Sequence, residues 1–177
     1  MQCRDRLFVV VSGAPGSGKT TLARPLAREL GLPLVRKDTI KEALGDAIGA
    51  PDYEASRRLG AVSLQLLRAL MRDIGFGVYD SPWRAEFDLA ELSRLPPPLV
   101  EVFCDCNPEV RLERIRDRQG TRHPVHFDLE RLGLVQDDPT DRPLAGPWPL
   151  LRVDTSRPVA IAQLAEQLRH AARGPRR

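Results

Sequence analysis

The sequence predicts a three-layer α/β fold in which a five-stranded parallel sheet lies between two layers of helices. Short apolar runs rich in β-branched residues alternate with longer amphipathic stretches along the 177 residues, and such repeated strand–helix units form parallel sheets covered on both faces. A glycine-rich run follows the first apolar run and leads into the first helix. Because no internal repeat or second apolar core is visible, we expect residues 1–177 to form one domain.

The expected strands are short and mostly apolar. The first, residues 7–11, is a continuous run of Leu, Phe and Val, as expected of a strand buried on both faces. The other four strands are expected at residues 33–36, 75–80, 99–103 and 150–154.

Capping residues and apolar spacing predict the helices. Asp38 or Thr39 is a candidate cap for the second helix, and Asn107 followed by Pro108 is typical of a helix start. The third helix carries an apolar face of Leu59, Val62, Leu66, Leu67 and Leu70. Helices are expected at residues 18–30, 39–48, 53–72, within 81–94, 108–119 and 157–172.

Composition narrows the class of protein. The net charge of +3 is compatible with phosphate or nucleic-acid ligands but requires neither. No run approaches the ~20 apolar residues that cross a bilayer, and the chain start lacks the pattern of a secretory signal, so we expect a cytoplasmic protein that does not enter membranes. The odd number of cysteines, three, predicts buried thiols rather than disulfides.

The glycine-rich run matches a phosphate-binding pattern, Gly-x-x-x-x-Gly-Lys-Thr. Its backbone N–H groups and the start of the following helix can surround the phosphates, Lys19 can reach the outer phosphates, and the Thr20 hydroxyl can bind Mg²⁺. A strand before the pattern and a helix after it are the setting that the motif needs. The predicted nucleotide-binding residues are Gly13, Ala14, Pro15, Gly16, Ser17, Gly18, Lys19, Thr20 and Thr21.

With this loop in this setting, the chain resembles the small P-loop kinases that phosphorylate hydroxyl groups. This group includes shikimate and gluconate kinases, chloramphenicol phosphotransferase, the kinase domain of phage polynucleotide kinase and the zeta-toxin group. The resemblance covers nearly the whole chain in the order of its elements, although only the phosphate loop is highly specific. It implies the strand order 2-3-1-4-5, ATP and Mg²⁺ as cofactors, and a short lid at about residues 119–148.

Asp38 is the candidate catalytic carboxylate. It follows the second strand, and the carboxyl ends of strands in open α/β sheets face the ligand. There it can orient or deprotonate the acceptor hydroxyl, as an Asp at a similar place does in chloramphenicol phosphotransferase and polynucleotide kinase. The alternative is that Asp38 only caps the next helix. Lys41 is either a substrate contact or an exposed helix residue.

Asp80 and Arg84 follow the third strand. Asp80 resembles the acidic residue that holds Mg²⁺, usually through water, but it can instead bind substrate. Arg84 is either a contact for an anionic or polar acceptor or one half of a surface ion pair.

The remaining candidate residues come from the second half of the chain. Arg118 matches the position that stacks on adenine in similar kinases, and Arg122 resembles a lid arginine that stabilises the transferring phosphoryl group. The loop of Thr155, Ser156 and Arg157 is expected beside the adenine, although Thr155 and Ser156 also suit a helix cap. A metal site at His123, His126 and Asp128 is the weaker alternative to a role in the lid or in acceptor binding.

These features predict an ATP- and Mg²⁺-dependent phosphotransferase that acts on a hydroxyl of a small metabolite or antibiotic and works as a monomer or homodimer. A polynucleotide 5′-hydroxyl kinase is an alternative, but the sequence shows no motif of alternating basic and aromatic residues for nucleic acid. A nucleotide-binding regulatory switch, without an acceptor, is the alternative from another class of protein.

Overall fold

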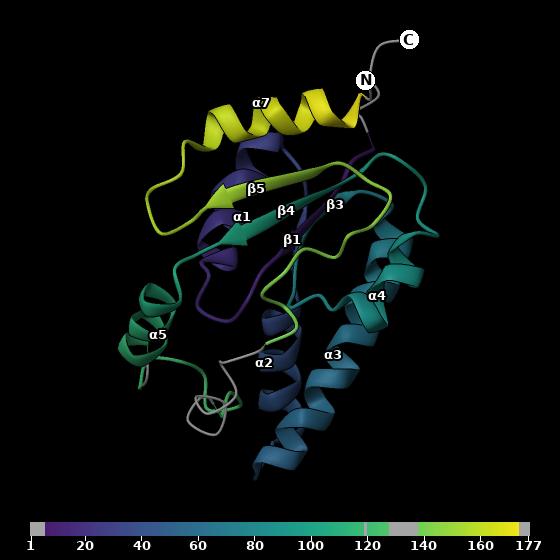
Figure 1. Cartoon of the computed structure of the whole chain (residues 1–177). Helices are drawn as coiled ribbons and strands as arrows, with labels where there is room; N and C mark the ends of the chain where they lie inside the picture. The colour runs from purple at the N-terminus through teal and green to yellow at the C-terminus, as the bar shows by residue number, and fades with distance from the viewer. Residues whose placement is uncertain (1–5, 119, 128–137, 174–177) are drawn as a thin grey trace.

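The computed structural model describes residues 6–118, 120–127 and 138–173. The five strands lie parallel in the order β2-β3-β1-β4-β5, which confirms the predicted fold class and strand order (Figure 1). Their bounds are β1 (Phe8–Ser12), β2 (Leu34–Arg36), β3 (Gly77–Asp80), β4 (Leu99–Asp105) and β5 (Leu150–Asp154).

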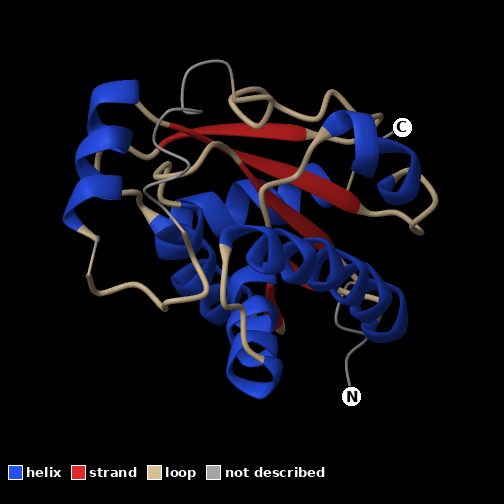
Figure 2. Ribbon diagram, turned by 90° about the horizontal axis from the view of Figure 1, so that it is seen from below, coloured by secondary structure: helices blue, strands red, loops and turns tan. Residues whose placement is uncertain are grey.

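Helices pack on both faces of this sheet, as Figure 2 shows for the strands and the blue helices around them. The helices are α1 (Lys19–Leu30), α2 (Lys37–Ile48), α3 (Tyr53–Ile74), α4 (Ala85–Leu92), α5 (Pro108–Asp117) and α7 (Ile161–Ala172). Among the described residues, no helix is long and apolar enough to cross a membrane.

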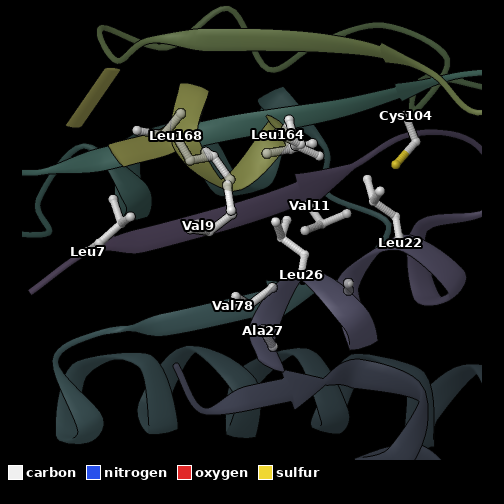
Figure 3. Packing of buried hydrophobic residues seen from close by; sticks show 14 residues of the cluster. Leu7, Val9, Val11, Leu22, Leu26, Ala27, Val78, Cys104, Leu164 and Leu168 are labelled. Carbon is white, nitrogen blue, oxygen red and sulfur yellow. The ribbon is translucent and has the colours of Figure 1, made fainter. Parts of the chain in front are cut away.

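Two apolar cores form because successive strand residues point to opposite faces of the sheet. On one face, Val9 and Val11 pack with Leu22 and Leu26 of α1 and with residues of α7, including Leu168 (Figure 3). On the other face, Phe8, Val10 and Tyr79 pack with Leu67 and Met71 of α3 and Leu92 of α4. The continuous apolar run of β1 is therefore explained by burial on both sides.

The register of the central strands brings the polar strand ends to one edge of the sheet. Val11 pairs with Asp80, and Asp80 in turn pairs with Arg36. The segments that follow β1, β2 and β3 therefore begin side by side, and these segments carry the phosphate loop, Asp38 and Arg84.

Two predicted helix starts are wrong. Helix α2 begins at Lys37 with Arg36 as its N-cap, so Asp38 lies in the first turn and is not the cap. Helix α7 begins at Ile161 with Ala160 as its N-cap, so neither Thr155 nor Ser156 caps it. The side chains of Asp38, Thr155 and Ser156 have other partners, which are described below. The predicted Asn107 cap of α5 is confirmed, because its side chain accepts a hydrogen bond from the Glu109 N–H.

The predicted apolar face of α3 is only partly buried. Leu59 and Leu67 are buried, but Val62, Leu66 and Leu70 are 43%, 42% and 38% exposed. The buried face instead runs through Ser56, Leu59, Ser63, Leu67 and Met71. Two small serines on this face let α3 lie close to its neighbours, a feature that apolar spacing alone does not predict.

Candidate active site

The phosphate loop joins β1 to α1, and glycine is required at two of its positions. Gly13 and Gly16 have φ angles of 135° and 78°, in the region that favours glycine. A Cβ on Gly13 would lie 2.8 Å from the Cys104 carbonyl oxygen, and one on Gly16 would lie 2.6 Å from the Arg111 carbonyl oxygen. The loop is thus pressed against the backbone of β4 and α5 and can hold only residues without a side chain there.

The loop fits a phosphate group. The first N–H groups of α1 have no partner within the helix and carry the positive end of its dipole. Within the described residues, the buried Ser17 hydroxyl has no hydrogen-bond partner. Unfilled donors of this kind at a helix start suit an anion.

Lys19 is held inside the loop. Its ammonium donates to the carbonyl oxygens of Gly13 and Ala14, at 2.7 and 2.8 Å. Burial lowers the pKa of Lys19, and the negative charge of Asp80 opposes that shift. A buried cation at this place is the group that phosphate oxygens would meet.

Thr20 and Asp80, the two predicted Mg²⁺ residues, lie together. The Thr20 hydroxyl donates to the Asp80 carboxylate at 2.6 Å. Burial raises the pKa of Asp80, while Lys19 and the Thr20 hydrogen bond oppose the rise. A hydroxyl and a carboxylate, both oxygen ligands, fit a hard cation such as Mg²⁺.

Asp38 lies between two cations. The Arg122 guanidinium is 2.8 Å from one carboxylate oxygen, and the Lys37 ammonium is 3.5 Å from the other. Burial would raise the pKa of Asp38, but Lys37, Arg122, His126 and Lys19 together hold it well below its usual range. The carboxylate is therefore ionised at neutral pH, and its side chain takes part in ion pairs rather than in a helix cap.

Residues 121–127, in the predicted lid, lie against α2 and α3. His126 contacts Glu42 at 3.0 Å and His123 contacts Asp46 at 2.9 Å. The Ser56 hydroxyl donates to the Val125 carbonyl oxygen at 2.7 Å. The rest of the predicted lid is only partly described, since Gln119 and residues 128–137 lie outside the described residues.

The two histidines contact different carboxylates, and no cluster of three metal-binding side chains occurs among the described residues. Asp128, the third residue of the alternative metal site, lies outside that part of the chain. The observed contacts instead join the histidines to α2.

The arginines of α5 have separate partners. Arg111 forms a two-bond ion pair with Asp141, at 2.7 and 2.9 Å, and its side chain is buried. Arg114 donates to the Thr155 carbonyl oxygen at 2.9 Å. Arg118, the candidate adenine contact, is near enough that its positive charge lowers the pKa of Lys19. Arg114 also lies against the phosphate loop, since a Cβ on Gly18 would be 3.4 Å from its guanidinium.

The loop after β5 contacts the backbone of the phosphate loop through Thr155. The Thr155 hydroxyl contacts the carbonyl oxygens of Ser17 and Asp105, at 2.6 and 2.8 Å. Ser156 accepts a hydrogen bond from the Asn107 N–H at 3.1 Å. Arg157 is largely exposed, with Asp154 4.0 Å away. The sequence predicted this loop near the nucleotide but not the structural use of the Thr155 hydroxyl.

A cavity of ≈ 250 Å³ lies beside Asp38 and includes Lys37, the neighbour of that residue, in its wall. Lys41 and Arg84, both predicted substrate residues, also line it. Tyr53, at the end of the segment 38–53 that the sequence predicts for the acceptor pocket, lines the cavity as well. Ser56 and Phe127 also line it but were not predicted, because their place depends on how α3 and residues 121–127 pack on α2.

Three comparisons place these features among known proteins. A family model described as an AAA domain, AAA_33, matches residues 8–138. A cytidylate kinase of Pyrobaculum arsenaticum is 51% identical over an alignment of 126 residues, and the match covers 64% of this chain and 61% of that protein. The chain thus spans about three fifths of the length of this curated relative.

Solved structures show the same fold over nearly the whole chain. A "putative kinase" from Chloroflexus aurantiacus has a TM-score of 0.81 and 32% identity, covering 93% of this chain and 97% of that one. A gluconokinase from Sinorhizobium meliloti 1021 has a TM-score of 0.59 and 22% identity, covering 95% and 94% of the two chains. A shikimate kinase from Acinetobacter baumannii, in complex with shikimate, has a TM-score of 0.55 and 19% identity, covering 93% and 91%. The last two show the fold alone.

Proposed function

The chain belongs to the AAA_33 family and has the fold of the small P-loop kinases, and from this we propose that it is an ATP- and Mg²⁺-dependent phosphotransferase. The proposed reaction moves the γ-phosphate of ATP to a hydroxyl of a small molecule. The observation that carries the proposal is the position of Asp38. This ionised carboxylate is near enough to Lys19 to be affected by its charge, and it lies 3.5 Å from Lys37, which lines the cavity.

Each half of the reaction has its own residues. Gly13–Gly18 and the start of α1 would hold the phosphates, and Lys19 would exchange its bonds to loop carbonyls for phosphate oxygens. Thr20 and Asp80 would hold Mg²⁺, which neutralises charge on the phosphates when bound. Arg118 and Arg122 are proposed to contact adenine and the transferring phosphoryl group.

Asp38 is proposed to orient the acceptor hydroxyl. Phosphoryl transfer proceeds through a loose transition state, in which bonding to the incoming oxygen is weak, so positioning contributes more than early proton removal. A carboxylate whose pKa is held low is a weak base but a constant hydrogen-bond acceptor at neutral pH. The hydroxyl proton then passes to Asp38 as the new bond to phosphorus forms.

A nucleoside monophosphate is the second candidate acceptor. The similarity to a cytidylate kinase, 51% identity over 126 residues, favours it. In that case the acceptor atom is a phosphate oxygen rather than a hydroxyl oxygen, and Asp38 has no hydroxyl proton to accept. A panel of acceptors that includes CMP and sugar acids separates the two candidates.

The test is ATP consumption with and without acceptors. We expect ADP release that depends on an acceptor in the wild type, no tight ATP binding or no turnover in Lys19→Ala, and retained ATP binding with lost transfer in Asp38→Asn. Rapid ATP use without any acceptor would instead indicate a nucleotide-dependent switch. Full transfer by Asp38→Asn would show that this carboxylate has no part in the chemistry.

A further inference from the structure

Most of the charged residues that line the cavity next to Asp38 are positively charged. Lys37, Lys41, Arg57, Arg68 and Arg84 contribute positive charge, and Asp88 is the acidic residue in the lining. Lys37 and Lys41 are buried, at 6% and 5% exposure. Burying ammonium groups is unfavourable unless negative charge or hydrogen-bond acceptors nearby offset the loss of water, so the partners of each cation decide whether the lining favours an anionic ligand.

Partners within the protein account for some of these charges. Arg57 pairs with Glu54 at the surface, and Lys37 lies beside Asp38. Arg68 contacts the Asp88 carboxylate, with its Nε at 3.1 Å. Lys41 donates to the Ser56 hydroxyl at 2.6 Å. Since Arg57, Arg68 and Lys37 have carboxylate neighbours, the argument for a ligand rests on Arg84, and Lys41 adds a second positive charge to the same wall.

Arg84 is positioned by its backbone. It is the N-cap of α4, and its N–H donates to Asp88 Oδ2 at 2.7 Å. Within the described part of the chain, no carboxylate lies at ion-pair distance from its guanidinium. Asp88 thus fixes where the residue sits, while the half-buried side chain contributes its charge to the cavity. The alternative of a surface ion pair, left open by the sequence, is not observed.

The cavity wall also contains aromatic, largely apolar side chains. Tyr53 and Phe127 meet edge to face, with ring centroids 6.2 Å apart, and both line the cavity. Phe87 adds a third aromatic ring to the lining. Aromatic side chains bury the apolar body of a ligand while a few polar groups fix its orientation.

We propose that the acceptor is an anion, carrying a carboxylate or phosphate group that binds Arg84 with support from Lys41, and a ring or other apolar body that lies against Tyr53 and Phe127. This inference rests on the proposed function, because it assigns the cavity to the acceptor. It narrows the substrate class from any small alcohol to alcohols that bear a negative charge.

The experiment measures binding rather than turnover. Wild-type protein is first saturated with Mg²⁺ and a non-hydrolysable ATP analogue, so that the phosphate loop is filled and anions are not captured there. Calorimetric titration then compares 3-hydroxybenzoate with 3-hydroxybenzamide, and ribose 5-phosphate with ribose. The first pair tests a carboxylate source of the charge and the second tests a phosphate source.

We expect at least one anion to bind about tenfold or more tightly than its neutral partner, since hydrogen bonds to charged groups are stronger than those between neutral groups. Arg84→Met should remove most of that difference without changing binding of the neutral compound, and Arg84→Lys should restore part of it. Arg94→Met is the matched control, because Arg94 lies just after α4, is 78% exposed and pairs with Glu91.

Equal binding of anion and neutral partner, unchanged anion binding in Arg84→Met, or no anion binding at millimolar concentration would each overturn the proposal. Binding of the ATP analogue, measured in the same samples, shows that a variant is folded. Because no phosphate is transferred, these outcomes concern the anion site alone. Absence of acceptor-dependent ADP release contradicts the kinase proposal separately.

Discussion

At the scale of single residues, the ion pair between Asp38 and Arg122 has two consequences. It holds the carboxylate ionised, and it places the candidate phosphoryl-stabilising arginine 2.8 Å from the residue proposed to orient the acceptor. When a phosphate group approaches, Arg122 would interact with that phosphate as well as with Asp38, so it would stabilise the ionised form of Asp38 less. Asp38 would then become a better proton acceptor at the stage when a proton has to be accepted.

The ion pair yields a prediction about the pKa of Asp38. Arg122→Met removes a positive charge that favours the ionised carboxylate, so the pKa of Asp38 should rise. Carboxyl ¹³C shifts followed through a pH titration measure this without depending on activity. Arg116→Met, at an exposed position of α5, is the control and should leave the Asp38 titration as in the wild type. An Asp38 titration unaffected by Arg122→Met would mean that the two side chains do not pair in solution.

Residue types, spacing and family resemblance were enough to name Lys19, Thr20, Asp38 and Asp80 as candidates for one site, and the structure places them near one another. Residue types and spacing did not predict the structural role of the buried Glu101, which accepts hydrogen bonds from Ser12, Leu144 and Trp148. A lone Glu in an apolar strand has no local pattern that names its partners. These partners lie up to 89 positions away in the chain and are known only after folding.

At the scale of elements, helix α2 and residues 121–127 fit closely through Gly45. A Cβ on Gly45 would lie 2.8 Å from Val125 Cγ2. The helix therefore lacks a side chain at the place where the predicted lid packs against it. The lid boundary was predicted from the family resemblance. The contact between Gly45 and Val125 could not be predicted, because a glycine in a helical pattern does not indicate which residue packs against it.

Gly45→Ala tests this contact. Replacing Gly by Ala inside a helix normally raises the free energy of unfolding by about 0.5–1 kcal/mol. Here the methyl group would press on Val125, so we expect no gain or a loss. The double variant Gly45→Ala with Val125→Gly, which also removes the Val125 Cβ that would lie 3.0 Å away, should recover the gain relative to Val125→Gly alone, as measured by urea unfolding.

Gly60→Ala is the matched control, since among the described residues a Cβ there would meet only the Lys37 ammonium, at 3.8 Å. It should stabilise α3 by the ordinary amount. If Gly45→Ala were as stabilising as Gly60→Ala, the close packing of residues 121–127 on α2 would be contradicted.

At the scale of the whole molecule, stability should depend on pH through His126. Its side chain is 2% exposed, and burial lowers its pKa to about 4 from an ordinary value of 6.5, against the opposing effects of Asp38 and Glu42. The unfolded chain binds this proton below about pH 6.5, whereas the folded chain binds it only near pH 4. The free energy of unfolding should therefore fall as the pH falls through this window, by about 3 kcal/mol at most.

Urea unfolding at several pH values measures this effect. Carboxylates also titrate in acid, so the informative quantity is the difference in slope between the wild type and His126→Gln. We expect the variant to lose less stability than the wild type between pH 6.5 and 4. Parallel curves for the two proteins would show that His126 is not buried in its neutral form.

The bond from Thr155 to the Ser17 carbonyl joins residues 138 positions apart. It bears on how the protein is made as well as on how it works. During synthesis the glycine loop leaves the ribosome well before β5 and the turn that follows it, which carries Thr155. Contacts between distant parts of a chain form slowly, and a growing chain lacks this one until Thr155 has emerged. We expect nucleotide affinity to arise only after β5 and Thr155 have been made, because a chain cut before β5 would carry the whole motif without the Thr155 hydrogen bond to its backbone.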